Sequence, residues 1–236
     1  MKLTTAGFIT SISCMLFTSA PVWAEEDFWE EHDAVVESVN DPMESWNRKV
    51  YQFNQSFDQY VMKPVARGYD DTAPKPVKQS ISNFFSNLSY PVVVANDLLQ
   101  GKFLQGGSDF ARFVVNSTVG VLGLFDPASH LDMVKHDEDL GQTFATWGVS
   151  EGPYLVLPFL GPASLRDGGG IIGDAYIDPL YAIDDTGARN ALVASKAVDT
   201  RYRLLKEGDM VDEAAIDPYA FMRSAYRQAR TQKNSR

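Results

Sequence analysis

The feature that most constrains this chain is a set of three long segments that carry no charged residue and are interrupted by Gly or Pro. A helix on the surface of a globular protein usually has a polar face opposite an apolar one, and these segments lack the charged face. None of them is an unbroken apolar run of about 20 residues, so none predicts a membrane span. The alternatives are a buried core and an apolar surface that lies against a bilayer or encloses lipid. The segments are Gln79–Asn96, Phe113–Phe125 and Gly152–Leu165.

The start of the chain is typical of a secretory signal peptide. A positive charge precedes the apolar run Ala6–Phe17, and Val22-Trp23-Ala24 supplies the small residues that signal peptidase reads. We therefore expect residues 1–24 to be removed and the mature chain to begin at Glu25. The single cysteine, Cys14, lies inside the apolar run without a lipoprotein-type sequence before it. We expect no acylation there, and hence a mature chain without disulfides or thiolate chemistry.

The charge of the chain is acidic overall and unevenly distributed. A formal net charge of −10 argues against nucleic acid as a partner, because affinity for phosphate backbones comes from Lys and Arg. It also argues that any membrane contact is mainly apolar. The length suits a single domain, which we place at residues 40–230. We expect residues 25–39 to be an acidic flexible leader, the basic end from Arg223 to fray, and residues 231–236 to be a basic tail.

The spacing of apolar residues predicts a mainly α fold with few or no strands. The best strand signal is Tyr154–Leu157, within a loop-rich middle region, Gly120–Asp185, that is dense in Gly and Pro. The first helix is expected to end before Pro64, and the second to break or kink at Pro91. The expected helices span residues 41–63, 74–90, 107–119, 139–147, 188–205 and 218–230.

No pattern in the sequence predicts catalysis. Residues 168–173 match G-x-G-x-x-G, but no strand precedes them, so we interpret them as a flexible loop or close-packed turn. The residues His130, Asp132, His136 and Asp137 do not have the spacing of a metal site and are expected in a solvated loop. We therefore predict neither an enzyme nor a bound metal or cofactor.

Short motifs collected along the chain point to one family. They are Asn40-Asp41-Pro42-Met43-Glu44, Asn47-Arg48, Phe53-Asn54, Pro64-Val65-Ala66, Asn83-Phe84, Asn87-Leu88, Leu99-Gln100-Gly101, Arg112-Phe113, Gly141-Gln142-Thr143, Trp147-Gly148, Gly152-Pro153-Tyr154, Leu157-Pro158, Gly161-Pro162, Arg166-Asp167 and Asp217-Pro218-Tyr219. In number, order and spacing, from Asn40 to Tyr226, they resemble the MlaA family, also called VacJ.

This resemblance implies a transport function. It implies an outer-membrane component, on the periplasmic side, that removes misplaced phospholipid from the outer leaflet and so maintains lipid asymmetry. It implies a largely helical ring that lies in the inner leaflet around a central amphipathic channel. It also implies a trimeric porin as membrane partner and a periplasmic lipid-binding shuttle protein as acceptor. Members of the family are typically lipoproteins, and the context of Cys14 departs from that pattern.

We predict that the lipid path follows the segment before Pro91. Asn83, Phe84, Phe85, Asn87 and Leu88 combine an apolar helical face with flanking amides, a pattern that suits an amphipathic passage.

Two further pairs of residues are candidates for function. Gly120 and Gly123 are expected to let a loop flex beside the path. Arg112 and Arg166 adjoin apolar segments, where an unpaired charge is costly. Each either forms an internal ion pair or binds lipid phosphate through its guanidinium fork.

Two other classes of function compete with lipid transport. One is an exported periplasmic binding or scaffold protein without a lipid channel. The other is an exported hydrolase with an unrecognised site.

Overall fold

A computed structural model describes residues 41–235 of the chain. The predicted signal peptide 1–24, the leader 25–39 and Cys14 lie outside the described residues. Residues 41–236 form one compact unit. Within its described part the fold is mainly α with one two-stranded sheet, as predicted. No helix there is long and apolar enough to cross a membrane.

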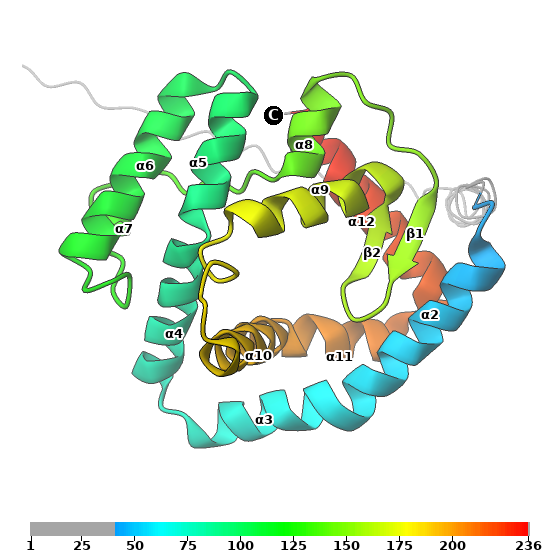
Figure 1. Cartoon of the computed structure of the whole chain (residues 1–236). Helices are drawn as coiled ribbons and strands as arrows, with labels where there is room; N and C mark the ends of the chain where they lie inside the picture. Colours follow the sequence, from blue (N-terminus) through cyan, green and yellow to red (C-terminus); the bar gives the residue numbers. More distant parts are fainter. Residues whose placement is uncertain (1–40, 236) are drawn as a thin grey trace, which may run out of the picture. The chain divides into compact units, whose positions relative to one another are not determined.

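The elements follow a simple order along this unit (Figure 1). They are α2 (Glu44–Phe57), the π-helix η1 (Asp58–Met62), α3 (Lys63–Thr72), α4 (Lys75–Leu88), α5 (Tyr90–Leu99), α6 (Phe103–Thr118), α7 (Pro127–His130), α8 (Leu140–Thr146), β1 (Tyr154–Leu157), β2 (Gly161–Ser164), α9 (Leu165–Ile177), α10 (Thr186–Arg203), α11 (Leu205–Ala214) and α12 (Pro218–Asn234). The helices expected over 107–119, 139–147, 188–205 and 218–230 are confirmed as α6, α8, α10 and α12.

Contacts between these elements form a closed circuit. The α2–η1–α3 helix and α4 lead to α5, which packs on both α8 and α9. Helix α9 packs on the β1–β2 hairpin, and β1 packs back on α2. Helix α10 lies against α3 and α4, and α12 lies against α8 and β2. Figure 1 shows the same succession of elements around the unit.

The first helix does not end at Pro64, contrary to the prediction. It continues through η1 into α3, where Pro64 occupies the first turn. The amide of Lys63 donates to the carbonyl of Asp58, five residues earlier, so a π-type turn precedes the proline. Such a turn shifts the hydrogen-bond ladder at the position where proline lacks an N–H. By contrast, the predicted break at Pro91 is confirmed, because α4 ends at Leu88 and α5 begins at Tyr90.

The β1–β2 hairpin is held against α2 by two asparagines. The predicted strand Tyr154–Leu157 is confirmed and pairs antiparallel with Gly161–Ser164, a strand that its Gly-Pro start concealed. Asn47 donates to the carbonyl of Tyr154 and accepts from the amide of Val156, both at 2.9 Å. Asn54, two helical turns later, donates to the carbonyl of Leu157 at 2.9 Å. These amides satisfy the outer edge of β1, beside which no strand lies among residues 41–235.

The glycines at 168–173 lie in helix α9, so the predicted loop is wrong. The Ser164 side chain caps the helix by accepting from the amide of Asp167 at 3.0 Å. A Cβ on Gly170 would lie 2.5 Å from the backbone nitrogen of Gly141 in α8. Glycine is therefore required there by the close approach of two helices, whereas both the flexible loop and the close-packed turn that were predicted are wrong.

The basic end of the chain also differs from the prediction. Helix α12 continues to Asn234, through most of the predicted tail. Arg223 and Arg230 are buried, and each forms ion pairs with carboxylates of other elements. These pairs fix the segment that was expected to fray.

Candidate functional site

The distribution of polarity in residues 41–235 is inverted relative to a typical globular domain. Among the residues described, buried polar and charged side chains outnumber buried hydrophobic ones. Large hydrophobic side chains are exposed on α2, η1, α3 to α6, α9 and α12, including Leu104 at 94% and Tyr176 at 89%. Extensive exposed apolar surface marks a contact with lipid or with another protein.

The densest run of exposed apolar side chains spans α6, α7 and the loops after each of them. It consists of Phe103, Leu104, Phe110, Val114, Val119, Val121, Leu122, Leu124, Phe125, Leu131 and Val134. We call residues 119–125 the apolar loop. Val121 and Leu122 adopt left-handed φ values of 53° and 57°, which cost free energy for residues with a Cβ. The loop thus presents its apolar side chains outward at the expense of local strain.

The predicted flexible glycines have a clear packing role in this loop. Gly120 and Gly123 are both buried. Gly123 has φ +87°, and a Cβ there would lie 2.5 Å from Cβ of Asn87 on α4. A Cβ on Gly120 would lie 2.4 Å from the carbonyl oxygen of Asn116. The two glycines let the apolar loop approach α4 and α6, and their flexibility stays a prediction.

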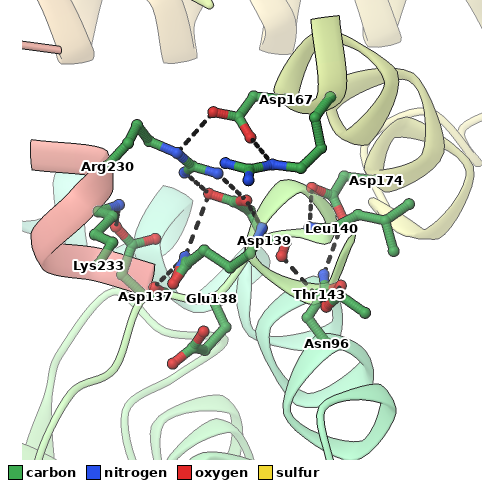
Figure 2. A network of polar contacts seen from close by, with 12 residues as sticks. Asn96, Asp137, Glu138, Asp139, Leu140, Thr143, Asp167, Asp174, Arg230 and Lys233 are labelled. Carbon is green, nitrogen blue, oxygen red and sulfur yellow. Dashed lines mark hydrogen bonds and ion pairs between the residues drawn. The ribbon is translucent and has the colours of Figure 1, made fainter. Parts of the chain in front are cut away.

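Charged side chains from α9, α12 and the start of α8 form ion pairs with one another. Figure 2 shows this group, which we call the closing seam: Arg230, Asp139 and Asp167, with Asn96, Thr143 and Asp174 beside them. Arg230 contacts Asp139 at 2.6 and 3.0 Å and Asp167 at 2.8 Å. It thereby joins α12 to the start of α8 and to α9.

The ion pairs of the seam stabilise the charged forms of Asp167 and Arg230. Burial by itself would raise the pKa of Asp167, but hydrogen bonding from Tyr226 and the cations Arg230 and Arg166 outweigh it and lower that pKa. Burial likewise opposes the charge of Arg230, yet Asp139 and Asp167 raise its pKa. Arg230 is ion-paired with both Asp139 and Asp167, which is typical of a structural network.

A cavity of about 700 Å³ lies between α4, α6 and the junction of α10 with α11. One wall is a polar stripe of α4 that recurs every three or four residues. The cavity is lined by Asp70, Lys75, Lys78, Gln79, Ser82, Asn83, Ser86, Asn87, Tyr90, Arg112, Asn116, Asp126, Lys135, Tyr202, Arg203, Leu205 and Lys206. Six of these residues are basic and two are acidic, so we call it the basic cavity.

A second cavity, of about 380 Å³, has a mainly apolar lining and lies between α2, the hairpin and α10 to α12. Its lining includes Tyr51, Tyr154, Val156, Pro162, Leu204, Val211, Phe221, Met222 and Ala225. The chain therefore holds a polar, cationic cavity and a separate, mainly apolar one.

The predicted path residues divide between the basic cavity and the protein interior. Asn83 and Asn87 line the basic cavity, and Asn87 donates to Ser117 Oγ at 2.9 Å. Phe85 is buried and packs edge-on against Phe84, with ring centroids 5.3 Å apart. Phe84, Phe85 and Leu88 are not among the residues that line this cavity. The amides of the predicted segment line the cavity, whereas Phe85 is buried and Phe84 and Leu88 are half-buried outside the cavity lining.

Both candidate arginines form internal ion pairs. Arg112 lines the basic cavity, but its donors are bound by Tyr90 Oη at 2.7 Å, Asp126 at 3.1 Å and the carbonyl of Met133. Arg166 is buried in α9 and contacts Asp167 at 3.0 Å. Of the two alternatives predicted for these arginines, both therefore form an internal ion pair. Direct contact of either with a lipid head group stays a prediction.

Several residues that line the basic cavity could not be identified from the sequence. Lys75, Lys78, Lys135, Arg203 and Lys206 come from four separate segments, which the fold alone brings together. The α4 lysines carried one usable signal, because they share a polar helical face with Gln79, Ser82 and Ser86 at spacings of three and four residues.

Two residues of the group His130, Asp132, His136 and Asp137 pair with side chains outside that group. His136 pairs with Asp109 at 2.8 Å, and Asp137 pairs with Lys233 at 2.5 Å. Within residues 41–235 no three His, Cys, Asp or Glu side chains are placed to hold a metal ion.

These features define a class: mainly helical domains that close on themselves, with paired charges inside and apolar side chains outside. The chain belongs to the MlaA lipoprotein family, whose profile matches residues 39–233. The family expected from the short motifs is thus confirmed.

Individual relatives agree with this assignment. The chain is 35% identical to the intermembrane phospholipid transport system lipoprotein MlaA of Escherichia coli strain K12, over 80% of this chain and 76% of that protein. It is 33% identical to the Haemophilus influenzae protein of the same name, over 82% and 78%. An uncharacterized protein of Rickettsia bellii is 32% identical over 94% of this chain and 89% of its own length.

The fold is similar to a solved structure from work on the maintenance of bacterial outer-membrane lipid asymmetry. The TM-score is 0.73 at 32% identity, covering 83% of this chain and all of the other.

Proposed function

We propose that this protein is the outer-membrane component of an intermembrane phospholipid transport system. It removes misplaced phospholipid from the outer leaflet and maintains lipid asymmetry. The observation that carries the proposal is the inverted polarity, with apolar side chains outside and polar side chains inside. The similar proteins of E. coli and H. influenzae, which are named for phospholipid transport, support it.

The exposed apolar surface is suited to one leaflet of a bilayer. The described helices are not long or apolar enough to span, yet they expose side chains such as Leu104 and Leu122. A domain of this kind lies in the interfacial and acyl region of one leaflet. We place it on the periplasmic side of the outer membrane, with a trimeric porin as partner and a periplasmic lipid-binding shuttle as acceptor. The protein acts as a transport component and not as an enzyme.

The basic cavity and its α4 wall form part of the lipid path in this proposal. Asn83 and Asn87 supply its amides, Phe84, Phe85 and Leu88 support the wall, and the apolar loop with Gly120 and Gly123 lies beside it. Arg112 contributes its positive charge to the cavity lining, while Arg166 acts through its ion pair with Asp167 of the closing seam.

The test is a strain that lacks the gene for this chain. Its surface-exposed phospholipid should rise and should return to normal when the full chain is expressed at its usual level. An unchanged amount of surface phospholipid in the deletion strain contradicts the proposal.

A deletion of Asn83 and Phe84 tests the α4 wall. Removing two residues rotates the preceding turns by about 200° relative to the following ones, which misaligns the polar stripe. We expect normal protein level with abnormal surface phospholipid. Loss of the protein, or normal lipid at normal level, contradicts a role for this wall.

A further inference from the structure

The basic cavity has the opposite sign of charge to the chain as a whole. The chain carries a formal net charge of −10, yet six cations and only two carboxylates line this cavity. A concave surface that gathers one sign of charge concentrates ligands of the other sign.

Part of this positive charge is not neutralised by the protein. Lys78 is paired with Asp70, Arg112 with Asp126 and Arg203 with Asp199. In the described part of the chain, Lys75 and Lys206 have no ion-pair partner, and Lys135 bonds only the hydroxyl of Ser86. Unpaired cations that converge on a cavity are the expected complement of an anion.

The electrostatics of Lys135 agree with a surplus of positive charge. Partial withdrawal from water lowers its pKa, and the nearby cations Arg203 and Arg112 lower it further. An anion bound among these groups would relieve that repulsion.

A neighbouring cavity joins the basic cavity to apolar side chains of the apolar loop. A cavity of about 510 Å³ shares Gln79, Asn83 and Asp126 with the basic cavity and adds Val119 and Phe125 of the apolar loop. A ligand with a phosphate at one end and hydrocarbon at the other could therefore place each end against matching side chains.

We propose that the basic cavity is a binding site for a phosphate-bearing anion, and that it favours phospholipids with anionic head groups over zwitterionic ones. The preference rests on the transport function proposed above. Both kinds of lipid carry a phosphodiester, but the ammonium of a zwitterionic head group would meet the unpaired lysines and be repelled.

Binding of short-chain lipids to the purified full chain in detergent micelles tests this directly. The probes are dihexanoyl phosphatidylglycerol, dihexanoyl phosphatidylcholine and inorganic phosphate, each titrated by calorimetry. We expect phosphatidylglycerol to bind about tenfold more tightly than phosphatidylcholine, since a tenfold ratio needs only a modest electrostatic difference. Raising the salt concentration should reduce that ratio.

The informative variant is the double substitution Lys75→Gln and Lys206→Gln. These lysines lack partners in the described chain, so their removal should leave the fold intact. It should weaken phosphatidylglycerol binding about tenfold and leave phosphatidylcholine nearly unchanged. The matched control, Lys49→Gln with Lys233→Gln, removes the same charge from residues outside the cavity lining and should bind as the parent does.

The outcomes separate the possible sources of the phosphate. Competition between inorganic phosphate and phosphatidylglycerol supports a shared phosphate site. Binding of inorganic phosphate without lipid supports the phosphate site and overturns its assignment to lipid. Equal binding by the parent and the Lys75→Gln, Lys206→Gln variant overturns the whole inference. If the parent also restores lipid asymmetry in cells, that failure leaves the proposed function standing.

Discussion

The closing seam and the basic cavity treat charge in opposite ways. In the seam, Arg230 lies between Asp139 and Asp167, and each charge is matched by a partner at hydrogen-bond distance. In the cavity, Lys75 and Lys206 face the same space without a partner in the described residues. A protein of this size tolerates buried charge only when it is paired, whereas charge beside a cavity can stay unpaired because water or a ligand solvates it. The comparison indicates that paired charges hold the circuit closed and that unpaired charges serve binding.

The largest effect should come from breaking the seam. Arg230→Met removes the cation that joins the buried Asp167 to the partly exposed Asp139, which should lower the free energy of unfolding by about 3–5 kcal/mol. Urea unfolding at pH 7.5 measures this. The deficit should shrink as the pH falls below about 4, since Asp167, whose pKa the seam lowers, then takes up a proton.

A control on the same helix keeps this test specific. Lys233 pairs with Asp137, whose side chain is 73% exposed. Lys233→Met should therefore cost less than about 1 kcal/mol. Equal losses for the two variants would contradict the distinction between the seam and an ordinary surface ion pair.

The next effect concerns a buried carboxyl that is only partly satisfied. Asp97 accepts from Gln105 at 2.7 Å, but its Oδ2 has no hydrogen-bond partner among the described residues. Burial, together with Asp109 and Glu138, raises its pKa from 3.8 to about 6. Between these values the folded chain holds a proton that the unfolded chain has lost, so stability falls as the pH rises through this range.

Asp97→Asn should remove that fall in stability. The variant should be about 2–3 kcal/mol more stable than the parent at pH 7.5, with the difference vanishing below about pH 4. Thermal unfolding from pH 3.5 to 8 measures both. Parallel stability curves for parent and variant would show that Asp97 keeps an ordinary pKa.

The glycines of α9 provide a smaller effect with a built-in comparison. Gly170→Ala would place Cβ against the backbone of α8 and should cost about 1–3 kcal/mol. Gly169 has no atom within 4 Å of its Cβ position, so Gly169→Ala should instead stabilise the helix by up to about 1 kcal/mol. Chemical denaturation of both variants decides. The same sign of change in both would contradict the close helix–helix approach.

The smallest effect is expected at the basic cavity. Lys75→Gln with Lys206→Gln should change the free energy of unfolding by less than about 0.5 kcal/mol, because neither lysine has a partner to lose. Urea unfolding measures this alongside the Arg230 variant. A loss comparable to that of Arg230→Met would make these lysines part of the structural network and remove the contrast.

The sequence predicted most helices because their apolar residues recur with helical spacing. It failed where a local rule had a structural exception. Pro64 was expected to end a helix, but a π-type turn accommodates it. The glycines of α9 suggested a loop, although Ser164 and Asp167 form a recognisable helix start.

The candidate site was predictable only in part. Asn83 and Asn87 were found because they lie in a segment without charged residues, and Arg112 was found because it adjoins another such segment. Lys135 and Lys206 could not be found, since only the packing of distant segments brings them to α4. Helical periodicity reports which residues share a face, but it contains no information on what a cavity gathers from other elements.

Mass spectrometry of lipid that co-purifies with the full chain tests the contrast between paired and unpaired charge most directly. The parent and the Lys75→Gln, Lys206→Gln variant are extracted in mild detergent from the same membranes. The account predicts bound phospholipid on the parent, enriched in anionic head groups relative to the membrane, and loss of that enrichment in an equally stable variant. An absence of phospholipid on the parent, or the same mixture of head groups on both proteins, would contradict it.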